Sequence, residues 1–138
     1  MRRGFKCKKK VFEDLKREYN QIVINKFNQN FLEALKQFDS LAENQLRGVL
    51  IRYYQNQRSR DSAWRTCKGS LYEYAVFRYI QQILEKNKKL KDKIFVMIGD
   101  EASNYKDQIV IQNWGKIFPD VDILIIEKDT QLVKAILS

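Results

Sequence analysis

The stretch FPDVDILII, residues 118–126, places two carboxylates, Asp120 and Asp122, at the start of an otherwise apolar, β-prone run. Because side chains alternate between the two faces of a strand, Asp120 and Asp122 share one face. A carboxylate at the mouth of a buried strand costs desolvation energy unless a cation compensates, and a divalent metal does so well. The stretch therefore predicts a strand with a metal-binding carboxylate pair. The alternative is a turn at Pro119 and Asp120, with Asp122 solvated at the strand edge.

Apolar runs on both sides of this stretch predict further strands. Residues 94–98 form a compact β-prone run that ends at Gly99 and Asp100, and residues 109–111 form a weaker one. Residues 132–137 follow a polar connector, 127–131, of hairpin length. We therefore expect residues 121–126 and 132–137 to pair as an antiparallel hairpin, in which Ser138 returns beside Asp122.

The first half of the chain is helical in its periodicity. Apolar residues at helical spacing predict a helix over about 10–25, and a second helix starts behind Asn30 as its cap, with Glu33 at the N3 position. A capping-box pattern at Ser40 and Glu43 predicts a third helix that runs to about Gln57. Helices come first and strands later, so the predicted class is α+β, with N-terminal helices followed by a mixed β-sheet and a C-terminal β-hairpin.

Residues 58–69 have no sustained periodicity, carry four cations and end at Gly69, and this pattern is typical of a loop. Ser70 then begins the most helical stretch of the chain, which ends in the charged run 85–93. Glu73 stands three residues after Ser70, as in a capping box.

A capped helix with Glu73, a strand that opens with PDVDILI and a short hairpin into an apolar strand together resemble the PD-(D/E)XK core of type II restriction endonucleases, over roughly residues 65–138. In that family an Asp at the start of one strand and an acidic-X-Lys triplet on the next bind Mg²⁺ and position the attacking water. The resemblance implies that Asp122, or else Asp120, is the first element and that Glu73 is the helical Glu. A purely structural capping role for Glu73 stays open.

The chain departs from the family pattern, because no acidic-X-Lys triplet follows Asp122. Ser138 falls on the acidic position, and the Lys would be due at position 140. The resemblance thus implies a Mg²⁺-dependent endonuclease that hydrolyses double-stranded DNA, in a form that stops before its catalytic Lys and lacks full activity. Dimerisation on palindromic sites is implied by the family only. We expect one domain, with a helical part at 1–64 and the nuclease-like core at 65–138.

The charge balance fits a polyanionic partner. The chain has 26 Lys and Arg against 17 Asp and Glu, a net charge of +9, and an isoelectric point near 9.6. A Lys-rich surface that only keeps the protein in solution is the alternative. The candidate DNA contacts combine cations with one aromatic side chain in the predicted loop, and further cations in the N-terminal arm. They are Arg58, Arg60, Trp64, Arg65 and Lys68, with Arg2, Arg3, Lys6, Lys8, Lys9 and Lys10.

Several other functions are excluded or disfavoured. The chain has no histidine, and Cys7 and Cys67 lie far apart, so zinc sites and His-based catalysis are excluded within it. The absence of a membrane-length apolar run and of a signal peptide predicts a cytoplasmic protein. The rival to a nuclease is a basic DNA- or RNA-binding or interaction module, whose carboxylates only cap helices and form turns.

Overall fold

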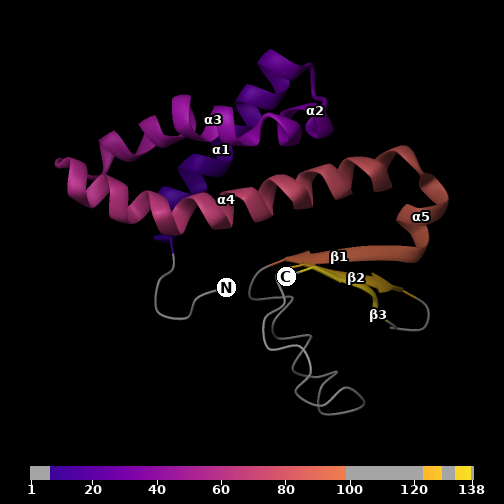
Figure 1. The fold of residues 1–138 in the computed structure, drawn as a ribbon. Helices are drawn as coiled ribbons and strands as arrows, with labels where there is room; N and C mark the ends of the chain where they lie inside the picture. Colours follow the sequence, from indigo (N-terminus) through magenta and orange to yellow (C-terminus); the bar gives the residue numbers. More distant parts are fainter. Residues whose placement is uncertain (1–6, 99–122, 129–132, 138) are drawn as a thin grey trace, which may run out of the picture. The chain divides into compact units, whose positions relative to one another are not determined.

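The computed structural model describes residues 7–98, 123–128 and 133–137 (Figure 1). The chain divides into two compact units, Arg2–Tyr79 and Ile80–Ser138, the second together with Met1. The first unit is helical, and the described strands belong to the second. Helix α4, Gln57–Lys86, starts in the first unit and ends in the second.

The first helix is held by one apolar face. α1, Lys9–Phe27, buries residues three or four positions apart, which is the spacing that places side chains on the same face of a helix. It ends at Asn28, whose backbone is left-handed (φ 49°) and whose N–H donates to the Val23 carbonyl, as in a common helix C-cap. The helix predicted over 10–25 is confirmed. The buried residues of α1 are Val11, Leu15, Tyr19, Ile22 and Val23.

The predicted cap of the second helix is also confirmed. α2 is Phe31–Lys36, and the Asn30 side chain accepts a hydrogen bond from the Glu33 backbone N–H at 3.1 Å. The third predicted helix is wrong in its start and its length. Residues Phe38–Asn44 form α3, so Ser40 lies inside a helix and caps nothing, and Leu46–Arg52 form a 3-10 helix, η1. Phe38, the first residue of α3, is buried in the core, so the apolar face of this helix begins two residues before the polar Ser40.

Helix α4 overturns two predictions at once. Its 30 residues include all of 58–69, so the predicted loop is wrong, and so is a helix start at Ser70. The N-terminal cap is Asn56, whose side chain accepts from the Ser59 N–H at 2.8 Å. The buried residues are Trp64, Cys67, Leu71 and Ala75, at spacings of three and four. Only Trp64 and Cys67 lie within 58–69, and two buried residues are too few to show the helical spacing of apolar residues in that segment.

The core of the helical unit is apolar and closely packed. Leu15, Leu46, Leu50 and Leu71 have no exposed surface, and burying each such side chain stabilises the fold by about 1.5–3 kcal/mol. Tyr19 is also fully buried, and this desolvation raises its pKa to about 12. A disulfide between Cys7 and Cys67 ties the residues before α1 to α4.

The second unit contains a short helix and an antiparallel sheet. α5, Lys88–Lys93, starts behind Asn87, whose side chain accepts from the Leu90 N–H, and leads into β1, Ile94–Ile98. β2, Ile123–Glu127, pairs antiparallel with β1 and with β3, Val133–Leu137. In the second ladder Ile123 stands opposite Leu137. The predicted strand at 94–98 is confirmed, and so is the antiparallel pairing of the two later strands over residues 123–126 and 133–137. Residues 109–111 and the expected position of Ser138 beside Asp122 lie outside the described residues.

The predicted fold class is nevertheless wrong. The described residues are mostly helical, and their strands form a sheet of order β1-β2-β3 in which both ladders are antiparallel. A mixed sheet also needs a parallel pair, which requires a long crossover connection, and the described strands contain none. The described part is thus not a restriction-endonuclease-like core. Within it, no helix is both long enough and apolar enough to cross a membrane.

Candidate nucleic-acid interface

The helical unit presents a basic ridge along α4. Five residues at alternating spacings of four and three are exposed, whereas the helix positions that lie between them are buried or half-buried. This ridge, called the exposed stripe below, is about 21 Å long at 1.5 Å per residue. It combines two guanidinium groups, two small residues and an aromatic ring, and it contains no carboxylate. Its residues are Arg58, Ser62, Arg65, Gly69 and Tyr72.

The carboxylates near the exposed stripe are already paired. Asp61 forms an ion pair with Arg47, which also lies 3.5 Å from Glu43. Neither Arg58 nor Arg65 has an ion pair with a carboxylate in the described part of the chain. The two guanidinium groups therefore have no described carboxylate partner that would compete with an external anion.

Arg60, a predicted DNA contact, has a structural role. Its guanidinium donates to the backbone carbonyls of Tyr54 at 2.9 Å and Gln55 at 3.1 Å. These carbonyls precede α4, so Arg60 holds the turn between η1 and α4. It lies between the exposed positions of the helix and is half-buried.

Trp64 and Lys68, two more predicted contacts, both bind Glu43 of α3. Trp64 is 3% exposed, and its Nε1 donates to Glu43 Oε1 at 3.2 Å. Lys68 Nζ donates to the same oxygen at 3.0 Å. These two hydrogen bonds, that of Lys68 foremost, hold the pKa of Glu43 below its usual value. Glu43 thus joins α3 to α4, and its two partners are committed to it.

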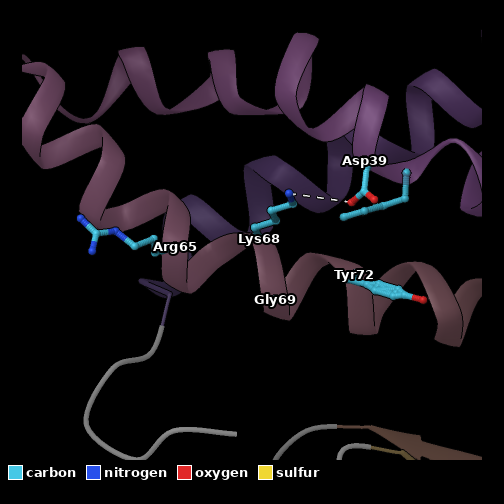
Figure 2. Close-up of a pocket in the computed structure, with 6 residues that line it drawn as sticks. Asp39, Arg65, Lys68, Gly69 and Tyr72 are labelled. Carbon is cyan, nitrogen blue, oxygen red and sulfur yellow. Dashed lines mark ion pairs between the residues drawn. The ribbon is translucent and has the colours of Figure 1, made fainter.

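Two hollows adjoin the exposed stripe. The first has a volume of about 380 Å³, and Phe38 and Tyr72 pack at its edge with ring centroids 5.3 Å apart. Figure 2 shows Lys68 reaching toward Asp39 across this pocket, with 3.8 Å between the charged atoms, whereas Arg65 points the other way. The lining residues are Phe38, Asp39, Arg65, Lys68, Gly69 and Tyr72.

The second hollow, called the disulfide cavity below, lies beside the Cys7–Cys67 bond and has a volume of about 410 Å³. Lys8 and Arg58 are its cations, and the Lys8 Nζ lies 5.8 Å from the centre of the Tyr54 ring. Besides the Tyr54 phenol, three aliphatic hydroxyl side chains complete the polar lining, and the described lining residues include no acid. The lining residues are Cys7, Lys8, Tyr54, Arg58, Ser59, Ser62, Ala63, Thr66 and Cys67.

Of the three residues of the predicted metal site, the structure describes only Glu73. Glu73 is half-buried in the middle of α4, so it cannot cap a helix with Ser70, and the capping role is wrong. Asp120 and Asp122 lie outside the described residues. Among the described residues, no cluster of three or more His, Cys, Asp or Glu could hold a metal ion. Coordination of Mg²⁺ by Glu73, Asp120 and Asp122 stays a prediction.

Sequence reasoning missed the disulfide cavity. Its cations are Lys8 and Arg58, and the sequence predicts both as DNA contacts without indicating that they line one cavity. What brings them together is the disulfide, and a pair of cysteines 60 residues apart carries no spacing signal. The sequence does contain a signal for the helix that carries Arg58, because Asn56 is a favourable N-cap residue and its side chain accepts a hydrogen bond from the Ser59 N–H at the start of α4.

Comparisons of this chain with protein-family models, with curated proteins and with solved structures find no match.

Proposed function

We propose that this chain binds double-stranded DNA through the exposed stripe of α4. The observation that carries the proposal is the composition of the stripe, in which Arg58 and Arg65 are two helical turns apart with no carboxylate between them on that face. Arginine on a helix is well suited to phosphate oxygens and to guanine edges, and a major groove about 12 Å wide admits an α-helix. The net charge of +9 adds long-range attraction to a polyanion.

The small residues of the stripe support the same role. Gly69 sits in the interior of a 30-residue helix, where glycine costs about 1 kcal/mol relative to alanine. A Cβ built at Gly69 meets no atom within 4 Å, so packing inside the protein does not require a glycine there. A glycine between Arg65 and Tyr72 leaves room for a ligand to approach the helix backbone closely.

We expect salt-sensitive DNA binding that depends on the stripe. With a fluorescent 20-base-pair duplex, Arg58→Ala combined with Arg65→Ala should weaken binding and lower the slope of log K against log salt by about two, since each phosphate contact contributes about one. The matched control is Lys26→Ala with Lys36→Ala, which removes the same charge from exposed positions at the ends of α1 and α2. Equal losses in both double variants would show that net charge alone attracts the DNA.

A further variant separates docking from stability. Gly69→Ala should raise the free energy of unfolding by about 1 kcal/mol, because it favours the helix and fits the open space. It should nevertheless weaken DNA binding, because the new methyl group stands where the ligand approaches. DNA binding that is unchanged or tighter in this variant would contradict close docking at Gly69.

A second candidate function is Mg²⁺-assisted hydrolysis of the bound DNA, and the β2–β3 ladder favours it. β2 begins at Ile123, directly after Asp122 in the sequence, so this carboxylate adjoins a paired strand. Metal assistance requires carboxylates that hold the ion against a phosphodiester, and unrelated folds provide them. In this proposal Asp122, Asp120 and Glu73 hold the Mg²⁺. A homodimer and a cytoplasmic location belong to the same proposal.

This candidate predicts a weak metal site without efficient cleavage. Mn²⁺ titrated calorimetrically into the 138-residue chain should bind, and Asp122→Ala should abolish the binding because it removes the main ligand. Asp92→Ala, which removes an exposed acid of α5, is the control and should bind normally. The chain should not cut DNA efficiently in Mg²⁺, because no acidic-X-Lys triplet follows Asp122 in it. Normal cleavage by both wild type and Asp122→Ala would contradict this candidate.

A further inference from the structure

The disulfide cavity differs from the other hollow in its charge balance. In the pocket of Figure 2, Lys68 is neutralised by Asp39 and Glu43. In the disulfide cavity neither Lys8 nor Arg58 has a carboxylate partner within the described residues. Two uncompensated cations that line one cavity repel each other, and an anion between them would remove that repulsion.

The rest of the lining offers hydrogen bonds of the matching kind. Ser59, Ser62 and Thr66 carry hydroxyls, which can donate to an oxyanion, and no described acid competes for them. The cavity also adjoins two helix starts, since Lys8 is the N-cap residue of α1 and Arg58 belongs to the first turn of α4. The partial positive charge at each helix N-terminus adds to that of the two side chains.

The disulfide is what assembles this group. Lys8 follows Cys7 directly, and the bond from Cys7 to Cys67 holds that part of the backbone against α4. Thr66 precedes Cys67 on the helix, so the bond places the arm cation beside the hydroxyls of α4. The Tyr54 ring, over which the Lys8 ammonium group lies, further restricts the position of that group.

We propose that the disulfide cavity is a binding site for a phosphate group, held by Lys8 and Arg58 with the hydroxyls of Ser59, Ser62 and Thr66. A volume of about 410 Å³ has room for more than one phosphate, so the site can accept a phosphate ester. The ester is a backbone phosphate of nucleic acid or a small phosphorylated molecule. The first source rests on the proposed function, because Arg58 and Ser62 belong to both the cavity and the exposed stripe.

The test uses the whole oxidised chain labelled with ¹⁵N, titrated separately with inorganic phosphate and with a nucleoside 5′-monophosphate. Both should shift the backbone amide signals of Ser59, Ser62 and Thr66, the monophosphate at lower concentration. Lys8→Ala and Arg58→Ala should each weaken phosphate binding about tenfold, as expected for one lost charge-assisted hydrogen bond. The matched control is Lys10→Ala, an exposed cation in the first turn of α1 that does not line the cavity. A loss in Lys10→Ala equal to that in Lys8→Ala would overturn the proposal.

Competition with duplex DNA separates the two sources. Displacement of phosphate by the duplex, together with weaker DNA binding in Lys8→Ala, identifies the group as a backbone phosphate. Monophosphate binding that the duplex does not displace leaves the phosphate site standing as a small-molecule site and counts against DNA docking at the stripe. DNA binding that Lys8→Ala does not change, with no phosphate bound in the cavity, overturns this inference and leaves the proposed function intact.

Discussion

Replacing both Cys7 and Cys67 by alanine is expected to lower the free energy of unfolding of the chain by about 4 kcal/mol, measured by urea unfolding under oxidising conditions. The two cysteines are 60 residues apart, so their bond closes a long loop and strongly restricts the unfolded chain. Typical domains are stable by only about 5–15 kcal/mol, so this loss is a large share of the total.

Reduction of the wild-type chain provides the control. A dithiol gives two electrons and two protons to the Cys7–Cys67 bond, becomes a cyclic disulfide itself and leaves two thiols in the protein. The reduced wild type should match the double alanine variant, and the variant should not respond to the dithiol. If the variant loses less than about 1 kcal/mol, the bond does not constrain the unfolded chain as the chain-entropy account requires.

The disulfide also bears on the cell compartment. Thiols in the cytoplasm are kept reduced, so the bond and the expected cytoplasmic location favour different environments. In a reducing compartment Lys8 would not be tied to α4, and the proposed phosphate site would lose one of its two cations. In an oxidising compartment the disulfide would keep the proposed site assembled.

The features that the sequence predicted well are those that local patterns determine. Val11, Leu15 and Tyr19 show the helical period within α1 itself, and Asn30 and Glu33 form a cap within four residues. The strand at 94–98 is a continuous β-prone run, and a polar connector of hairpin length indicated that β2 and β3 pair. In each case the residues that determine the structure are neighbours in the sequence.

The sequence is least informative where a side chain's partner is distant. Three of the predicted DNA contacts, Arg60, Trp64 and Lys68, also bind groups of their own protein, and their contact with DNA stays a prediction. For Trp64 and Lys68 that partner is Glu43, more than 20 residues away, and a cationic cluster in a sequence does not show which cations are already bound. The fold class failed for a similar reason, because a local pattern does not show how strands that are far apart in the sequence, such as β1 and β2, pair.

Residues 58–69 gave the largest local error, and Ser62→Pro tests it. Ser62 is exposed, so a substitution there does not disturb the core. It lies inside α4, so a substitution that breaks a helix should destabilise the protein. Proline in a helix interior removes a backbone hydrogen bond and clashes with the carbonyl four residues earlier, which costs about 3 kcal/mol or more. We therefore expect Ser62→Pro to lower the free energy of unfolding by at least about 3 kcal/mol in urea, with a loss of helical circular dichroism.

Ser62→Ala is the matched control, because it removes the same hydroxyl and leaves the backbone intact. Alanine favours a helix over serine by about 0.5 kcal/mol, so this variant should be slightly more stable than the wild type. The opposite signs of the two changes separate helix from loop, since an exposed loop residue tolerates both substitutions with little effect. If Ser62→Pro costs less than about 1 kcal/mol, residues 58–69 do not form a helix in solution, and the exposed stripe, which requires Arg58, Ser62 and Arg65 on one helical face, does not exist.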